Sequence, residues 1–262
     1  MSALAQTPEV EFSAAEVEAF RRDGFVIVRG LAGRTHCAEM KKLAQDHLVH
    51  AVPPVEYEAD VRYPGSPMSQ AGPGGRTVRR LLQAYARDAL FRAWALSPAI
   101  GSRLSRLLGA QPLLSQAHHN CVMTKDPRYS SRTGWHQDIR YWSFAKPELI
   151  SVWLALGEET AENGCLQLVP GSHTRDFRRD QFDELLFFRS DLDENRALID
   201  GAVRAELAPG DVLFFHSRLL HAAGWNRTAE TKLSVVFTYH DADNHPLPDT
   251  RSASLPSVPM AA

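Results

Sequence analysis

The sequence predicts a mainly β protein, an antiparallel sandwich or jelly roll buttressed by helices. Two observations predict this fold class. Residues 13–110 are mainly helical in pattern, whereas after residue 111 short apolar runs separated by turn residues dominate, without a helix between each pair. With 262 residues, 44% of them hydrophobic, the chain can build one large core. We therefore expect a single domain over residues 1–262, composed of a helix-rich part (13–110), a jelly-roll core (111–241) and a C-terminal extension (242–262).

The first elements carry clear boundary signals. Ser13 and Glu16 form a capping box, in which each side chain bonds a backbone N–H that the first helical turn leaves unpaired. A short helix to about Arg22 is therefore expected. The β-branched and aromatic run 25–28 then predicts a strand. Apolar residues recur at helical spacing over residues 35–49 and predict an amphipathic helix with one buried stripe.

Residues 52–76 hold so many prolines and glycines that regular structure is excluded over most of the segment. Long loops of this kind in compact domains are lids, binding loops or disordered segments, and a lid is our interpretation here. Helical patterning resumes over residues 81–94. A further helix is expected after Ser97, where a serine N-cap precedes a proline at the first helical position, and it should end at Gly109.

The β half is predicted from six apolar runs. They cover residues 113–123, 149–156, 165–169, 203–207, 211–215 and 233–239. Residues 177–188 interrupt the series with a pattern that predicts an inserted helix, and the polar residues 191–200 predict a surface loop. The tail 246–262 has four prolines and little apolar content, so we expect a loosely packed extension.

The charge balance and the cysteines narrow the class of partner. Twenty-nine basic against 31 acidic residues give a formal charge of −2, so no overall basic field would attract nucleic acid or an anionic membrane. The chain shows no targeting pattern and no apolar stretch long enough to cross a bilayer. The three cysteines are far apart and outside any CxxC pair, which suits the reducing cytoplasm. We expect a soluble cytoplasmic protein with a small-molecule substrate, and no pattern indicates its oligomeric state.

Residues 134–142 contain the strongest functional pattern. His136 and Asp138 are separated by one residue, and alternate side chains of an extended strand point to the same face, so both can reach one metal ion. His221 offers a third ligand. Two histidines and one carboxylate leave three positions of an octahedron free, which suits ferrous iron, whereas zinc is more often held by three histidines or by cysteines. The alternative is that His136 and Asp138 are a hydrogen-bonded pair on the surface that binds no metal. The chain has eleven histidines, so a histidine and an aspartate can have this spacing by chance.

These residues also carry a resemblance to a known family. Four stretches occur in the order and spacing of the phytanoyl-CoA dioxygenase family of Fe(II)/2-oxoglutarate oxygenases, which the chain resembles from about residue 13 to 241. The stretches are residues 23–30, 135–138, 162–173 and 221–228. The resemblance implies a double-stranded β-helix, the cupin-like form of the jelly roll.

The resemblance also implies which residues hold the iron. The ligands would be His136, Asp138 and His221. His216 and His173 are rival third ligands, because both occur near strand ends, but only His221 stands in the family's His-x-x-Gly-x-Asn segment.

The implied cosubstrates are 2-oxoglutarate and O2. In the family, the far carboxylate of 2-oxoglutarate pairs with an arginine eleven residues after the distal histidine, and a serine two residues after that histidine assists. Here those positions hold Lys232 and Ala223. Lysine lacks the two-pronged fork of arginine, so it fixes a carboxylate less firmly. The alternatives are that Lys232 is a solvated lysine on a strand edge and that Arg227 is the cation. By the same resemblance Trp153, Arg80 at the start of a helix, and Cys121 are expected to contact the cosubstrate.

The implied reaction is oxidation of a substrate C–H bond coupled to decarboxylation of 2-oxoglutarate. Halogenases similar to this family leave the carboxylate position to chloride by using a small residue. Asp138 fills that position, so hydroxylation is favoured over halogenation. Ala223 and Lys232 keep two alternatives open, a non-catalytic jelly-roll binding protein and an iron oxygenase with a different cosubstrate.

The candidate substrate contacts follow only from their placement beside the ligands. They are His119, Arg140, Trp142 and Trp225. Aromatic walls and one cation suit a small or medium-sized polar molecule with an anionic group. No motif in the chain indicates binding of coenzyme A.

Overall fold

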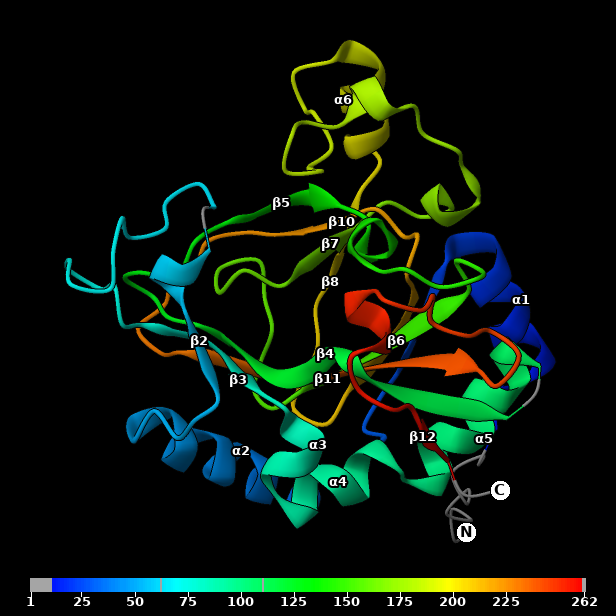
Figure 1. Cartoon of the computed structure of the whole chain (residues 1–262), viewed down its shortest axis with the longest axis horizontal. Coiled ribbons are helices and arrows are strands. Elements are labelled where there is room, and N and C mark those ends of the chain that lie inside the picture. The colour runs from blue at the N-terminus through cyan, green and yellow to red at the C-terminus, as the bar shows by residue number, and fades with distance from the viewer. Residues whose placement is uncertain (1–10, 62, 110, 261–262) are drawn as a thin grey trace, which may run out of the picture.

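The computed structural model describes residues 11–61, 63–109 and 111–260, and these form two facing β-sheets with helices on one side (Figure 1). The larger sheet runs in the order β1 (Phe25–Val28), β9 (Val212–His216), β6 (Leu149–Ala155), β11 (Lys232–Asp241), β4 (Pro112–Lys125), β3 (Val78–Leu82) and β2 (Val55–Tyr57), and β12 (Val258–Pro259) also pairs with β4. The smaller sheet runs β5 (Thr133–His136), β10 (His221–Ala223), β7 (Leu166–Leu168) and β8 (Val203–Ala205). Because the described pairs are antiparallel and the chain alternates between the sheets, the predicted jelly roll is confirmed.

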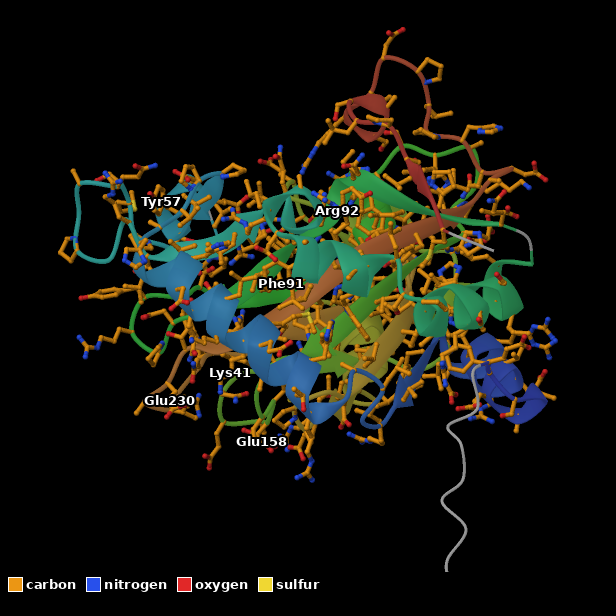
Figure 2. All side chains as sticks on the ribbon, turned by 90° about the horizontal axis from the view of Figure 1, so that it is seen from below. Lys41, Tyr57, Phe91, Arg92, Glu158 and Glu230 are labelled. Carbon is orange, nitrogen blue, oxygen red and sulfur yellow. The ribbon has the colours of Figure 1, made fainter. Side chains whose placement is uncertain are left out.

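A layer of helices covers the outer face of the larger sheet, as predicted. Figure 2, seen from below, shows this layer in front of the strands. The helices of the chain are α1 (Ala14–Asp23), α2 (Arg34–Val49), α3 (Ala84–Arg87), α4 (Ala89–Ala95), α5 (Pro98–Leu108) and α6 (Asp193–Ile199), of which α6 lies apart at the top of Figure 1. Met40, Phe91 and Leu104 from this layer are fully buried in one cluster with the outward side chains of β4 and β11. Packing of this apolar face is what holds the layer to the sheet.

Local signals set the helix ends as the sequence predicts. Ser13 Oγ accepts a hydrogen bond from the Glu16 N–H at 3.3 Å, and Glu16 Oε2 accepts one from the Ser13 N–H at 2.8 Å. Gly24 then ends α1 with a φ of 84°, a left-handed conformation that favours glycine. Helix α5 starts at Pro98 and ends before Gly109, which has a φ of 89°.

The side chains of β11 alternate between the core under the helices and the space between the two sheets. Phe237 and Tyr239 point outward and join the core under the helices, whereas Val236 points inward and packs with Trp153 and Phe215. The inward face therefore lines the interior of the jelly roll. β4 has one irregularity: Phe237 pairs with Asn120 but its neighbour pairs with Ser115, so residues 116–119 bulge out of the ladder.

Four predictions about local structure were wrong, or wrong in part. Residues 177–188 form no helix but a short 3-10 turn, η4 (Arg179–Gln181), and a cluster of phenylalanine rings whose members lie 4.9 to 6.1 Å apart. The predicted loop 191–200 instead contains α6, because the buried Asn195 side chain bonds Gln181 and a backbone carbonyl and so ties this polar helix to the turn. Tertiary contacts override the local pattern in both segments.

The third error concerns Arg80, which lies within strand β3 and not at a helix start. β3 pairs with β2 on one side and β4 on the other, so its apolar run is that of a strand buried on both faces. The rest of the predicted helical pattern is split between α3 and α4. In the preceding loop, β2 and the 3-10 turn η1 (Glu58–Asp60) are regular, and residues 63–77 are not.

The fourth error concerns the tail, which is docked and not loosely packed. Strand β12 pairs with β4, and Met260 is buried. In the 3-10 turn η5 (Arg251–Ala253), Ser252 Oγ accepts a hydrogen bond from the Ser143 N–H at 2.8 Å and lies 2.7 Å from His118 Nε2. The remaining 3-10 turns are η2 (Asp138–Tyr141) and η3 (Ser172–Thr174).

Candidate metal centre

His136, Asp138 and His221 converge on one point between the sheets. His136 ends β5, His221 begins β10, and the two are directly paired across the smaller sheet. Asp138 is the first residue of η2, so it lies just beyond the strand and not on it as the spacing predicted. One ligand atom of each residue lies within 4.8 Å of the others, and the two histidine Nε2 atoms are 3.5 and 3.8 Å from Asp138 Oδ1. Within the described residues this is the group of side chains able to hold a metal ion.

Backbone carbonyls orient both imidazole rings toward the metal position. His136 Nδ1 lies 2.9 Å from the Gly134 carbonyl, and His221 Nδ1 lies 2.9 Å from the Leu219 carbonyl. An Nδ1–H that donates to a carbonyl leaves the Nε2 lone pair free as a ligand. Asp138 Oδ2 is buried and accepts no hydrogen bond from any described residue. A buried carboxylate oxygen without a donor and two aimed Nε2 atoms fit a divalent cation, and the 2-His-1-carboxylate set is the one that Fe(II) oxygenases use.

The electrostatics of Asp138 and His221 favour their metal-binding protonation states. Burial would raise the pKa of Asp138, but the neighbouring His119, His221 and His136 outweigh it and hold that pKa well below its usual range. Burial, followed by the proximity of His136, lowers the pKa of His221 to about 4. An ionised aspartate and a neutral histidine are the forms that coordinate a metal.

The triad opens into a cavity of about 330 Å³ between the two sheets. Strands of both sheets line it, with β3, β4 and β11 among those of the larger sheet and β5 and β10 among those of the smaller one, and Tyr63 from the loop and Arg251 from the tail also contribute. Six of the predicted cosubstrate and substrate residues line this cavity: Arg80, His119, Cys121, Trp142, Trp153 and Lys232.

Lys232 lies at the end of the cavity formed by the first residues of β11, and it is buried. Its Nζ is 2.8 Å from Glu159 Oε2 and 5.1 Å from the centre of the Trp153 ring. Glu159 Oε1 accepts further hydrogen bonds from Trp153 Nε1 at 2.8 Å and from Ser234 Oγ at 2.6 Å. The side chain of Lys232 is only 4% exposed, which excludes the solvated lysine of the alternative interpretation.

Arg80 and Cys121 contact the cavity from neighbouring strands. The guanidinium of Arg80 forms a two-pronged ion pair with Glu56, at 2.8 and 2.6 Å. Burial would lower the pKa of Arg80, but neighbouring acidic groups, with Glu56 in direct contact, hold it above its usual range, so the guanidinium stays charged. Burial raises the pKa of the Cys121 thiol to about 11, and it is therefore a neutral group facing the cavity.

His119 and Trp142 lie beside the metal position. His119 Nδ1 is 3.6 Å from Asp138 Oδ2, and the rings of His119 and Trp142 meet edge to face at 5.2 Å. The ring of His118 also stacks with that of Trp142, with ring centres 4.9 Å apart. These three aromatic rings form one wall of the cavity.

Arg140 and Trp225 lie outside the cavity. The guanidinium of Arg140 sits 3.5 Å over the ring of Phe182, and its Nε donates to Gln137 Oε1 at 3.1 Å. Trp225 is 40% exposed and lines a separate, smaller cavity of about 180 Å³ together with Arg227. The rival third ligands also lie elsewhere, because His216 and His173 pack against each other with ring centres 5.3 Å apart.

Sequence reasoning missed four charged residues at this site: Arg79 of β3, Lys125, Glu159 and Arg251. Lys125 could have been found from the alternation of β4, because His119, Cys121 and Met123 at every second position also line the cavity. Glu159 follows β6 in a turn, and no local pattern marks it. Arg251 belongs to the docked tail.

The comparisons with known proteins agree with this geometry. The profile of the phytanoyl-CoA dioxygenase (PhyH) family matches residues 20–234. The chain belongs to the phytanoyl-CoA dioxygenase family. A probable phytanoyl-CoA dioxygenase of Caenorhabditis elegans is 24% identical over 88% of this chain and 76% of that protein. The peroxisomal phytanoyl-CoA dioxygenase of Homo sapiens is 29% identical, but the match covers only 49% of this chain and 40% of the human enzyme.

Solved structures give the same result for this phytanoyl-CoA dioxygenase family member. The epimerase SnoN from nogalamycin biosynthesis, crystallised with Fe3+, alpha ketoglutarate and nogalamycin RO, has a TM-score of 0.71, 25% identity and 95% coverage of each chain. EctD from S. alaskensis, crystallised with 2-oxoglutarate and 5-hydroxyectoine, has a TM-score of 0.73, 19% identity and coverage of 92% and 80%. Together with the His-Asp-His site, these matches show an iron- and 2-oxoglutarate-dependent dioxygenase. No helix in the described residues is long and apolar enough to span a membrane.

Proposed function

We propose that the protein hydroxylates a C–H bond of a small or medium-sized molecule. The observation that carries this proposal is the position of Asp138, which fills the carboxylate place of the triad, the place that the related halogenases leave to chloride. A relative of similar length supports it, because L-proline trans-4-hydroxylase of Streptomyces griseoviridis is 24% identical over 72% of this chain and 79% of that enzyme. An epimerase and a carbocyclase share the fold, so C–H oxidation without oxygen insertion is the competing outcome.

His136, Asp138 and His221 would hold the iron on one face and leave the opposite face open to the cavity. The iron, with 2-oxoglutarate and O2, supplies the oxidation of an unactivated C–H bond. The backbone bonds to both Nδ1 atoms keep the ring planes fixed. Closure of the cavity over the substrate would keep water from the reacting atoms and so protect the oxidising site from side reactions.

The cosubstrate would extend from the metal toward Lys232. Trp153 and Cys121 line the path between these two ends, and Arg80 adds a cation whose charge is already matched by Glu56. Ala223 also lines the cavity but offers no hydroxyl. These placements support Lys232, Trp153, Arg80 and Cys121 as the cosubstrate contacts.

The substrate would bind on the side of His119 and Trp142. Because Arg140 and Trp225 lie outside the cavity, we restrict the proposed substrate contacts to His119 and Trp142 and add Arg251, whose side chain reaches the cavity from η5. One cation beside aromatic rings favours a substrate that carries an anionic group.

The loop 63–76 is our candidate lid. Tyr63 lines the cavity, its ring meets Phe187 edge to face at 5.0 Å, and a Cβ on Gly65 would lie 2.1 Å from the ring of Trp225. These contacts would hold the loop over the cavity in the closed state. For the compartment we keep the cytoplasm, supported by three free cysteines that are all buried.

The test is turnover by the reconstituted protein. Purified protein with Fe(II), 2-oxoglutarate and O2 is incubated with a panel of small acids and their neutral analogues, and succinate and product masses are followed. We expect more succinate than in a His136→Ala control. We also expect one of the acids to be converted to a product that contains one additional oxygen atom. A product that loses two hydrogens, or that changes only its stereochemistry, would contradict hydroxylation. Preference for the neutral analogues would contradict the role of Arg251.

A further inference from the structure

Two lysines face each other at the end of the cavity remote from the substrate wall. Lys125 is the last residue of β4, Lys232 is the first residue of β11, and the two are directly paired in the ladder, so their side chains share one face (Figure 1 shows the two strands side by side). Both are buried, with 8% and 7% of their surfaces exposed. Like charges placed opposite each other on neighbouring strands repel, and burial adds to the cost.

Only one of the two lysines is neutralised. Lys232 forms the ion pair with Glu159, whereas the ammonium of Lys125 donates to the backbone carbonyl of Ser131 at 3.1 Å and has no carboxylate in ion-pair range within the described residues. The other nearby carboxylate, Glu58, accepts hydrogen bonds from Ser131 and lies 3.6 Å from Arg79. Lys125 is therefore a buried cation without an anion.

A glycine, Gly164, leaves the space that the side chain of Lys125 occupies. Gly164 faces the stem of Lys125, and a Cβ at that position would lie 2.9 Å from Lys125 Cδ and 2.6 Å from the Gly224 carbonyl oxygen. Gly164 also has a φ of 76°, so a larger residue would be strained there as well as crowded. The stem of Lys125 thus passes close to the Gly164 backbone, while its Nζ donates to the Ser131 carbonyl.

We propose that Lys125 and Lys232 together bind the far carboxylate of 2-oxoglutarate, with Lys125 supplying the unmatched positive charge and Glu159 positioning Lys232. This assignment rests on the placement of 2-oxoglutarate proposed above. A single arginine offers two N–H donors in one plane, and two ammonium groups from neighbouring strands offer the same number of contact points by another route. The far carboxylate would supply the anion that Lys125 lacks.

The acid–base behaviour of Lys125 agrees with this role. Burial, followed by the charges of Lys232 and Arg79, lowers the pKa of Lys125 to about 7, against the opposite effect of Glu58 and Glu159. A bound carboxylate favours the charged ammonium. The affinity for 2-oxoglutarate should therefore fall as the pH rises above 7, because the free protein then has to take up a proton on binding.

The test compares two ligands and two lysines. Protein loaded with Fe(II) is titrated without oxygen, and the visible charge-transfer absorption of the iron–keto acid chelate reports binding. 2-Oxoglutarate is compared with 2-oxopentanoate, which keeps the keto acid and the chain length but lacks the far carboxylate. Lys125→Met removes the ammonium, Lys125→Arg retains a cation, and Lys42→Met, an exposed lysine on α2, is the matched control.

We expect Lys125→Met to weaken 2-oxoglutarate binding ~10- to 100-fold, the range for a hydrogen bond to a charged group, while 2-oxopentanoate binding changes less than ~3-fold. Lys125→Arg should recover part of the loss, and the pH dependence above 7 should disappear in Lys125→Met. Equal weakening of both keto acids, or no weakening of either, would overturn the assignment. Failure of the unmodified protein to give the absorption band with either ligand would overturn the proposed cosubstrate site itself.

Discussion

The two ends of the cavity are built on opposite electrostatic principles. The metal end has the Asp138 carboxylate and two imidazoles from the smaller sheet, and the buried Asp138 Oδ2 accepts no hydrogen bond from any described residue. The other end has two lysines from the larger sheet, Lys125 and Lys232, and among the described residues Glu159 is the one carboxylate in direct contact with either of them. Each end therefore lacks the charge of the group it would bind, a cation in one case and an anion in the other. The comparison teaches that the unmatched charges of a buried site indicate its ligands.

The largest effect is expected at the metal end. Asp138→Ala removes the only anionic ligand, so iron affinity should fall by more than ~100-fold and succinate formation should stop. The measurement is the iron retained after gel filtration, together with turnover. Asp180→Ala, at a side chain that is 71% exposed, is the matched control and should keep both properties. Iron retention unchanged in Asp138→Ala would show that the Asp138 carboxylate is not needed to hold the metal.

The next effect should separate charge balance from ligand binding at the lysine end. Lys232→Met leaves Glu159 buried without its cation, which should cost about 3 kcal/mol in the free energy of unfolding. The double variant Lys232→Met/Glu159→Gln removes both charges and should recover at least half of that loss. Both are measured by denaturant unfolding of the metal-free protein. If the loss of stability in the double variant equalled the sum of the losses in Lys232→Met and Glu159→Gln alone, the Lys232–Glu159 ion pair would not explain the instability of Lys232→Met.

The lowered pKa of Lys125 should make the free energy of unfolding depend on pH. Between a folded-state pKa of about 7 for Lys125 and an ordinary lysine value of about 10.4, the unfolded chain holds a proton that the folded protein has released. The free energy of unfolding should therefore rise with pH across this window, by on the order of 1–3 kcal/mol. Unfolding curves at several pH values measure it. Lys125→Met should flatten the rise, and so should saturating 2-oxoglutarate with iron; a rise that persists in the variant would contradict the lowered pKa.

The smallest effect concerns a group that the lysine end lacks. Ala223 lines the cavity at the position where the family resemblance implies a serine, and Ala223→Ser should tighten 2-oxoglutarate binding ~3- to 10-fold through one added hydrogen bond to a charged group. Titration of the charge-transfer absorption is the measurement. Because 2-oxopentanoate lacks the far carboxylate, its affinity should stay the same. Weaker binding of 2-oxoglutarate would mean that the far carboxylate does not lie beside residue 223.

The residues of the metal end were predicted from the sequence, whereas those of the lysine end were predicted only in part. The metal end depends on a short local motif and one distant histidine, so spacing and family resemblance pointed to all three residues. Only the backbone of Asp138 was misplaced, because the strand ends at His136 and Asp138 begins the 3-10 turn η2. The lysine end depends on the register between β4 and β11 and on a turn glutamate, Glu159. Register is a property of the folded sheet, so Lys125 had no visible partner in the sequence.

The same distinction explains the errors elsewhere in the fold. Capping and turn signals act within a few residues, and the ends of α1 and α5 follow them closely. The strand β3 and the helix α6 depend on distant partners, β2 and β4 for the first and Gln181 for the second. An apolar run can be a buried strand or a helix, and only its neighbours decide between them.

The bulge at residues 116–119 has a consequence for how such an enzyme can change. On either side of it, β4 and β11 keep their pairing, and Asn120 Nδ2 closes it by donating to the Gln116 carbonyl at 3.3 Å. The bulge carries His118 and His119 into the substrate wall, whereas Lys125 lies beyond it in the regular ladder. Residues can thus be added, removed or exchanged in the bulge without shifting the register that sets the lysine pair. Selection for a new substrate can therefore act on the bulge, while the part of β4 that carries Lys125 and its proposed cosubstrate contact stays unchanged.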